Sequence, residues 1–184
     1  MKSLLTQEEL FNKLNFTHIL IDSCIWLEYY EYTEAFEPLI KYLQAVHCDI
    51  LTLPIIKFEV LRSQNLENYQ RLNTIIDDYA LNFTGYKDKT ITEEALNIAR
   101  IYKKNSNTSA SFIDCYMISI ILSLQKSPFI LTENHKDFTS LLFDPIYIHP
   151  IPIQTKNGTL KIYTPCIYEF NKTKYAKELA KLSR

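Results

Sequence analysis

The sequence predicts a single α/β domain in which helices cover both faces of a parallel sheet. Short apolar runs that suit buried strands alternate with longer segments whose apolar residues recur at helical spacing. Hairpin signals are nearly absent before residue 150, and strands that are joined through helices run parallel. With 184 residues and 47% hydrophobic content, the chain can form one sizeable core. We therefore expect an α/β sandwich with a central sheet of about four to five strands.

Two strand–helix units follow a short amphipathic helix at the N-terminus. Residues 18–21 form an apolar run that predicts a buried strand, and residues 25–45 have the apolar spacing of a helix. Residues 49–54 predict a second buried strand, and Pro54 suits the first turn of the helix that follows it. Each of these two strands is therefore expected to lead directly into a helix.

Three helices are predicted in the middle of the chain. The apolar residues of 66–80 recur at three- and four-residue steps, which is typical of an amphipathic helix. Thr90 and Glu93 have the spacing of a capping box, so a further helix is expected to begin at Thr90 and to end near Lys104. Residues 111–124 are apolar on most sides, and a helix of that composition is expected to be buried.

Two more strands and a distinct C-terminal segment complete the chain. Residues 128–132 and 144–149 predict the third and fourth strands. After that point Asn157-Gly158 separates two short apolar runs, which indicates a hairpin, and a basic helix is expected to follow. We therefore divide the chain into a domain of residues 1–150 and a C-terminal extension of residues 151–184, which holds the hairpin or strand and the helix.

The charge balance excludes a strongly basic surface. The formal net charge is −1, so any surface that binds nucleic acid must be local. The basic residues that could form one are Lys57 and Arg62 on one predicted helix, and Arg100, Lys103 and Lys104 at the end of another. The same residues also fit ordinary solvated helix faces. Only 2 glycines occur, so no glycine-rich phosphate-binding loop is expected.

Cysteine usage and targeting signals indicate the compartment. The chain has 4 widely spaced cysteines with no CxxC pair and no cluster of zinc-site spacing, so we expect reduced thiols. The N-terminus lacks the apolar stretch of a signal peptide, and no apolar run is long enough to span a bilayer. We therefore expect a soluble, cytoplasmic protein without a membrane partner.

Four acidic residues interrupt or end hydrophobic runs: Asp22, Glu59, Asp114 and Asp137. Carboxylates are costly to bury unless they are paired, hydrogen-bonded or bound to a cation. Ligands of α/β sheets bind beyond the carboxyl ends of the strands, which is where Asp22 follows the first strand. Oxygen ligands suit Mg²⁺ or Mn²⁺, and the chemistry that such a site supports is hydrolysis of a phosphodiester.

Simpler roles compete with metal binding at each of these acids. Asp22 precedes a predicted helix and could cap it. Asp114 has capping-box spacing with Ser111, and an acid in the first turn also complements the helix dipole. Glu59 could pair with a basic neighbour on its own helix, and Asp137 could be solvated in a loop. The order of the four acids along the strands and helices is more specific than any one of them.

Four segments, residues 19–23, 51–61, 112–114 and 129–138, carry a resemblance to a known family. In this order they resemble the PIN-domain (PilT N-terminus) nucleases, and within that family the VapC-like toxin ribonucleases. The resemblance implies a PIN-like three-layer α/β/α sandwich. It also implies a metal-dependent endoribonuclease that hydrolyses single-stranded or structured RNA and leaves a 5′-phosphate and a 3′-hydroxyl. Such an enzyme could be the toxin of a toxin–antitoxin system.

The resemblance also implies which residues form the site. Three acids would be the catalytic and metal-binding core, assisted by two hydroxyl residues. These are Asp22, Glu59 and Asp114, with Ser23 and Thr132 as the hydroxyl residues. Relatives often have an aspartate where this chain has Asn134, so either Asn134 or Asp137 completes the site. We expect Asp137 as the fourth metal ligand and Asn134 as a neutral contact to the cofactor, Mg²⁺ or Mn²⁺.

The partners expected from the resemblance are an RNA substrate, an antitoxin protein and a second copy of the chain, because VapC-like toxins are masked by antitoxins and commonly form homodimers. The amide at Asn134 leaves a second function open. A catalytically weak or inactive PIN-like scaffold would bind RNA or a protein partner without cutting. A phosphotransfer domain of similar architecture is disfavoured, because Asp22-Ser-Cys lacks the paired acids of such sites.

Overall fold

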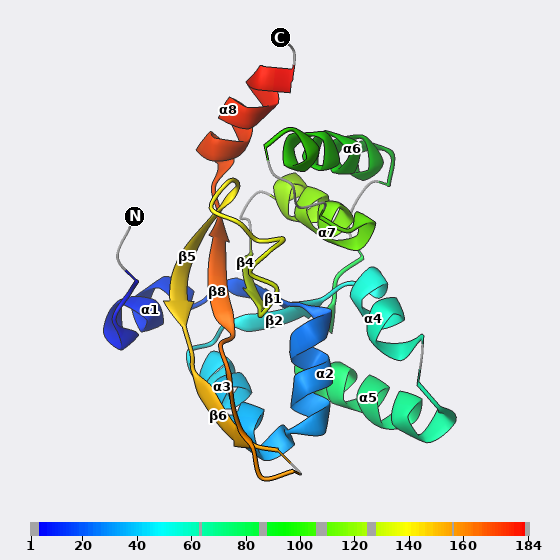
Figure 1. Cartoon of the computed structure of the whole chain (residues 1–184), viewed down its shortest axis with the longest axis vertical. Helices are drawn as coiled ribbons and strands as arrows, with labels where there is room; N and C mark the ends of the chain where they lie inside the picture. Colours follow the sequence, from blue (N-terminus) through cyan, green and yellow to red (C-terminus); the bar gives the residue numbers. More distant parts are fainter. Residues whose placement is uncertain are drawn as a thin grey trace.

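The computed structural model describes residues 4–62, 64–84, 88–105, 110–124, 128–155 and 157–182. Within these ranges the chain forms eight helices and eight strands. Six strands make one sheet in the middle of the molecule, and the helices are arranged around it (Figure 1). The protein therefore has the α/β architecture that the alternating sequence pattern predicts. No helix in the described ranges combines the length and the apolar character needed to cross a lipid bilayer.

The first third of the chain follows the predicted order of elements with one difference. It contains α1 (Gln7–Leu14), β1 (His18–Ile21), α2 (Ser23–Glu31), α3 (Thr33–Ala45), β2 (Asp49–Thr52) and α4 (Pro54–Leu61). The single helix predicted over residues 25–45 is two helices, because Tyr32 leaves the helical region with φ −132° and ψ 51°. The Thr33 hydroxyl donates to the Tyr29 carbonyl at 2.9 Å. It takes a position that a backbone N–H would occupy in a continuous helix.

The remaining elements also lie close to their predicted positions. They are α5 (Leu66–Tyr79), β3 (Leu81–Asn82), α6 (Asp88–Asn105), α7 (Phe112–Ser123), β4 (Phe129–Thr132), β5 (Phe143–Ile148), β6 (Ile151–Gln154), β7 (Leu160–Tyr163), β8 (Cys166–Phe170) and α8 (Lys172–Leu182). Helix α6 begins at Asp88, slightly before the start predicted at Thr90. Helix α7 is buried along most of its length, as its apolar composition predicts.

The large sheet is mixed, not parallel throughout as we expected. Its strand order is β3-β2-β1-β4-β8-β5. Strands β3, β2, β1 and β4 pair in parallel, whereas β8 is antiparallel to both of its neighbours, β4 and β5. The sequence analysis missed β3, which has only two residues, and β8, which directly follows a proline. The apolar side chains of β8 are buried between the flanking strands, and this long-range packing is what recruits it.

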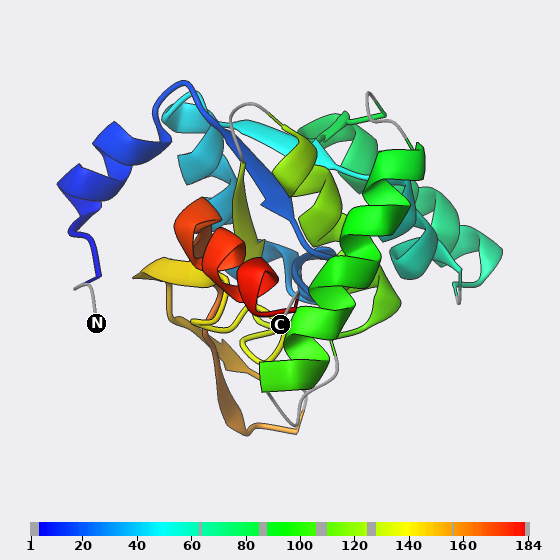
Figure 2. The same cartoon turned by 90° about the horizontal axis from the view of Figure 1, so that it is seen from above.

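The segment after residue 150 contributes to the centre of the sheet. Strands β6 and β7 form the predicted antiparallel hairpin around Asn157-Gly158. Strand β8 then lies inside the sheet, and α8 packs against α6 (Figure 2). The division of the chain at residue 150 stays a prediction about domains. The structure adds that the sheet itself extends across that boundary.

The register of β1 and β4 brings two predicted site segments together. Ile21 at the end of β1 pairs with Leu131 near the end of β4. The backbone N–H of Asp22 donates to the Leu131 carbonyl at 3.1 Å, so the pairing continues one residue beyond β1. Asp22 and Thr132 therefore leave the same edge of the sheet on neighbouring strands. Helix α4 begins beyond the same edge, after β2.

Candidate active site

Asp22 is a buried carboxylate that caps α2 and accepts four hydrogen bonds, one of them from the Cys24 thiol. Its side chain is 5% exposed. One carboxylate oxygen accepts from the Ser23 backbone N–H at 2.7 Å and from the Ser23 hydroxyl at 3.3 Å. The other accepts from the Thr132 hydroxyl at 2.6 Å. Asp22 therefore caps α2 as predicted, and the hydrogen bonds hold both of its carboxylate oxygens in one orientation.

The loop after β4 extends this hydrogen-bonded chain to Asp137. The Thr132 hydroxyl, which donates to Asp22, accepts from the Asn134 backbone N–H at 2.8 Å. The Asn134 side-chain amide donates to the half-buried Asp137 carboxylate. The backbone carbonyl of Asp137 in turn accepts from the Tyr102 hydroxyl of α6. The structure thus connects the predicted residues Asp22, Ser23, Thr132, Asn134 and Asp137 in one continuous network.

Asp114 lies in the first turn of α7 and is 6% exposed. The predicted capping box is present, because the Ser111 backbone N–H and hydroxyl both donate to the Asp114 carboxylate. Burial raises the pKa of Asp114 to about 6 in spite of these hydrogen bonds. The charges of Asp137 and Asp22 contribute to this raised pKa. The two aspartates therefore lie near enough to Asp114 for their charges to act on it.

The acidic cluster of Asp22, Asp114 and Asp137 carries negative charge that no described side chain neutralises by an ion pair. Among the described residues, no lysine, arginine or histidine forms an ion pair with Asp22, Asp114 or Asp137. In the same part of the chain, no three histidine, cysteine or acidic side chains are arranged to hold one metal ion together. The cluster is therefore a repulsive arrangement of carboxylates that a bound cation would stabilise.

Glu59 is near the cluster in the fold but is not joined to it. It is half-buried on α4, which packs against both α2 and α7, the helices that begin at Asp22 and carry Asp114. The Glu59 side chain takes part in none of the side-chain hydrogen bonds or ion pairs between described residues, including the predicted pairing with Lys57 or Arg62. Lys57 instead pairs with Asp77 at 2.7 Å. The metal-binding role of Glu59 stays a prediction.

Cys24 is a site neighbour that the sequence analysis did not assign to the site. Its thiol donates to the Asp22 carboxylate at 3.4 Å and lies 3.5 Å from the Thr132 hydroxyl. Burial, followed by the charge of Asp22, raises the pKa of the Cys24 thiol to about 12. Cys24 is therefore a protonated donor at neutral pH. Its position in the first turn of the helix that Asp22 caps was the signal that could have revealed it.

Of the other cysteines, Cys115 directly follows Asp114 in α7, whereas Cys48 and Cys166 lie elsewhere in the core. All four cysteines are free thiols, and Cys48, Cys115 and Cys166 are buried. Burial raises the pKa of each of these three thiols to about 11. They therefore remain protonated at neutral pH and pack as small apolar side chains.

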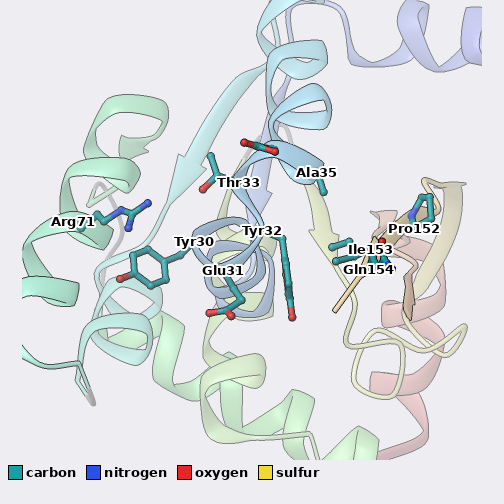
Figure 3. A pocket seen from close by; sticks show the side chains of 10 residues that line it. Tyr30, Glu31, Tyr32, Thr33, Ala35, Arg71, Pro152, Ile153 and Gln154 are labelled. Atoms are coloured by element: carbon teal, nitrogen blue, oxygen red, sulfur yellow. The ribbon is translucent and has the colours of Figure 1, made fainter. Parts of the chain in front are cut away.

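A separate cavity of about 630 Å³ opens between the junction of α2 and α3, helix α5 and strand β6 (Figure 3). The Arg71 guanidinium lies 5.0 Å from the centroid of the Tyr30 ring at one side of it. None of the four predicted site acids lines this cavity. This cavity is therefore separate from the acidic cluster, and its volume does not describe the space around those acids.

The sequence matches no model of a protein family and no curated protein. The resemblance to PIN-domain nucleases thus depends on the four sequence segments. What the structure contributes is the arrangement of the residues in those segments.

Proposed function

We propose that the protein is a metal-dependent endoribonuclease of PIN type, a phosphodiester hydrolase that acts on single-stranded RNA. One observation carries the proposal: Asp22, Asp114 and Asp137 gather closely enough to raise the pKa of Asp114, and no ion pair among the described residues neutralises them. Repulsion between neighbouring carboxylates disfavours their charged forms, and Asp22 lies beyond the carboxyl end of β1, so the arrangement supports a cation-binding role. The PIN-like three-layer arrangement belongs to the same proposal.

The donor set suits Mg²⁺ or Mn²⁺. All three groups offer carboxylate oxygens, which hard divalent cations prefer. Mg²⁺ is usually held through one or two carboxylates and keeps several waters, so a cage of three protein ligands is not required. Asp22, Asp114 and Asp137 would hold the ion. Each ionised carboxylate has about four acceptor sites, so the hydrogen bonds to Asp22 and Asp114 leave room for a cation.

The surrounding residues would orient the acids before substrate arrives. Ser23 and Thr132 fix the two oxygens of Asp22, and Ser111 fixes the carboxylate of Asp114. Asn134 connects Asp137 to the same network through its backbone and its side chain. The bound cation would neutralise charge that develops on the phosphate and lower the pKa of an attacking water. Residues that are already held in position contribute to catalysis, because they do not have to reorganise during the reaction.

The resemblance supports further, more specific proposals. Within a VapC-like system the protein would act as a toxin, be masked by an antitoxin protein and form a homodimer. Single-stranded or looped RNA is favoured over duplex, because unpaired bases can be splayed into a protein site.

A second candidate function is a PIN-like scaffold that binds RNA or a protein without cutting. The observation that favours it is that no three potential ligands among the described side chains are arranged around one ion. Asn134 has an uncharged amide where relatives often have an acid, and this also favours the scaffold. In this scaffold, Asn134 and Thr132 would hold the loop after β4 in place without a cation.

The deciding experiment is cleavage of an end-labelled single-stranded RNA with Mn²⁺, with EDTA, and by Asp114→Asn protein. Asp78→Asn is a matched control, because Asp78 is an exposed acid on α5 outside the acidic cluster. We expect cleavage by the wild type and the control in Mn²⁺ only, and none by Asp114→Asn. RNA binding without cleavage, together with no Mn²⁺ binding by calorimetry, would reject the enzyme in favour of the scaffold.

A further inference from the structure

Helices α4 and α5 lie side by side (Figure 1) and pack against each other. Residues of both helices line a cavity of about 390 Å³. Pro54, the first residue of α4, and Asn82, the last residue of β3, both line it. Strands β1, β2 and β3 are adjacent and parallel, so the cavity opens at the same edge of the sheet where Asp22 follows β1. Neighbouring strands lie about 4.8 Å apart, which places the cavity within a few nucleotides' reach of the acidic cluster.

Two aromatic side chains of this cavity are largely exposed. Phe58 on α4 is 60% exposed and Tyr69 on α5 is 44% exposed. Exposed aromatic rings in a concave site are available to stack on a planar ligand. A cavity of this volume falls in the range of sites that bind small organic groups.

The charge of the cavity is complementary to a phosphate. Lys57 lines it, but its ammonium group is neutralised by Asp77 at 2.7 Å. Arg62 also lines it, is exposed, and forms no ion pair with any residue that the structure describes. A guanidinium group can contact a phosphate with two parallel hydrogen bonds. The cavity therefore combines exposed aromatic rings with a guanidinium group that can bind a phosphate.

The walls of the cavity are held in place before any ligand binds. Asp77 of α5 accepts from Lys57 of α4 at 2.7 Å and from the Asn73 side chain at 2.7 Å. This connection joins the two helices across one side of the cavity. A preformed site avoids the free-energy cost of ordering its side chains on binding.

Arg62 also relates the cavity to the predicted active site. It is the C-cap residue of α4 and follows Glu59 by three residues, a spacing that puts two side chains on the same side of a helix. Arg62 therefore lines the cavity and is a neighbour of the half-buried Glu59 along the helix. A strand with one base in the cavity would present its backbone phosphate to Arg62.

We infer that the α4–α5 cavity binds an unpaired RNA base beside the cleaved phosphate, with Phe58 and Tyr69 stacking on the base and Arg62 contacting the phosphate. The inference rests on the proposed ribonuclease function and specifies its substrate: single-stranded RNA with an intact base next to the cut. Stacking on an aromatic ring tolerates any base, so this cavity selects for unpaired RNA more than for sequence.

The test compares Phe58→Ala, Phe58→Trp and Phe16→Ala proteins in RNA binding and cleavage. Phe16 is a matched control, because it is 73% exposed and precedes β1 at the opposite edge of the sheet. Binding of a labelled single-stranded RNA is measured by fluorescence anisotropy in Ca²⁺, and cleavage in Mn²⁺. We expect a 5- to 150-fold, order-of-magnitude loss of affinity for Phe58→Ala, and near wild-type affinity for Phe58→Trp and Phe16→Ala.

A second arm replaces one RNA base at a time by an abasic nucleotide. When the base at one position next to the cut is missing, the affinity of the wild type for the RNA should fall by a similar factor. The affinity of Phe58→Ala should be the same for the intact RNA and for the RNA that lacks this base. Unchanged thermal melting of the variants shows that they fold.

The possible outcomes separate this inference from the proposed function. RNA binding that depends on Phe58 but occurs without cleavage keeps the base site and rejects the nuclease. Cleavage by Phe58→Ala at wild-type KM rejects the base site and keeps the nuclease. If Phe58→Ala changes only the oligomeric state in sedimentation, the cavity is a contact between copies and the inference is wrong. If the wild type neither binds nor cuts RNA, both are overturned.

Discussion

Replacing Asp114 by asparagine should stabilise the protein at neutral pH while it removes activity. Burial in the folded protein raises the pKa of Asp114 to about 6, from an ordinary value of 3.8. A carboxyl group whose pKa is raised by folding binds its proton more tightly in the folded state, so its ionisation costs folding free energy. That cost is absent below the unfolded pKa and complete above the folded pKa.

The size of the effect follows from the shift. A difference of roughly two pKa units corresponds to about 3 kcal/mol at pH 7.5, and about half of that remains at pH 5. Asparagine keeps an acceptor for the Ser111 backbone N–H but carries no charge, so it also removes the repulsion from Asp22 and Asp137. The variant should therefore gain up to about 3 kcal/mol over the wild type at pH 7.5, and almost nothing at pH 4.

The assay is urea unfolding of both proteins in EDTA at pH 4, 5 and 7.5. Asp78→Asn, an exposed acid on α5, serves as the control and should show no such trend. Added Mn²⁺ should raise the free energy of unfolding of the wild type, because a ligand that binds only the folded state stabilises it. The difference in stability between the wild type and Asp114→Asn should therefore become smaller. If the stabilities of the wild type and Asp114→Asn change in parallel between pH 4 and 7.5, folding does not raise the pKa of Asp114, and the reasoning is refuted.

Two further changes test the network and the sheet. Thr132→Val removes a buried hydroxyl that donates to Asp22 at 2.6 Å and accepts from Asn134 at 2.8 Å, so it should cost about 1–3 kcal/mol in urea unfolding and reduce RNA cleavage. Unchanged cleavage by Thr132→Val would contradict the orienting role given to Thr132. Ile167→Ala in β8 creates a cavity beside β4 and β5 and should cost about 2–5 kcal/mol in a single cooperative transition. A separate early transition would instead indicate that the C-terminal segment unfolds on its own.

Local pattern was enough to locate most elements of the fold. The strand at residues 18–21 lies where its apolar run predicts, and the capping box of Ser111 and Asp114 starts α7 as expected. Such features depend on residues within one turn or one strand of each other. The helix predicted over residues 25–45 was wrong at Tyr32, because periodicity cannot detect a hydroxyl that replaces a backbone N–H.

The order and direction of the strands in the sheet were harder to predict from the sequence. Strand β8 has the apolar character of a buried strand, but no neighbouring residue in the sequence indicates its partners. It lies between β4 and β5 and runs antiparallel to both. Its pairing partners lie some tens of residues away. A parallel sheet was therefore the natural prediction and the mixed sheet the observed one.

The candidate site divides in the same way. By itself, the sequence determined which acids follow strands or open helices, since hydrophobic runs mark strand ends and serine spacing marks helix starts. Only the tertiary structure decided which of them meet. The Thr132 hydroxyl reaches Asp22 across 110 positions. Burial, and then the charges of two aspartates distant in the sequence, raise the pKa of Asp114, and Glu59 is left outside their network. Hydrogen bonds and charge repulsion depend on distance in space, and that distance is fixed by strand register and helix packing, which no local pattern encodes.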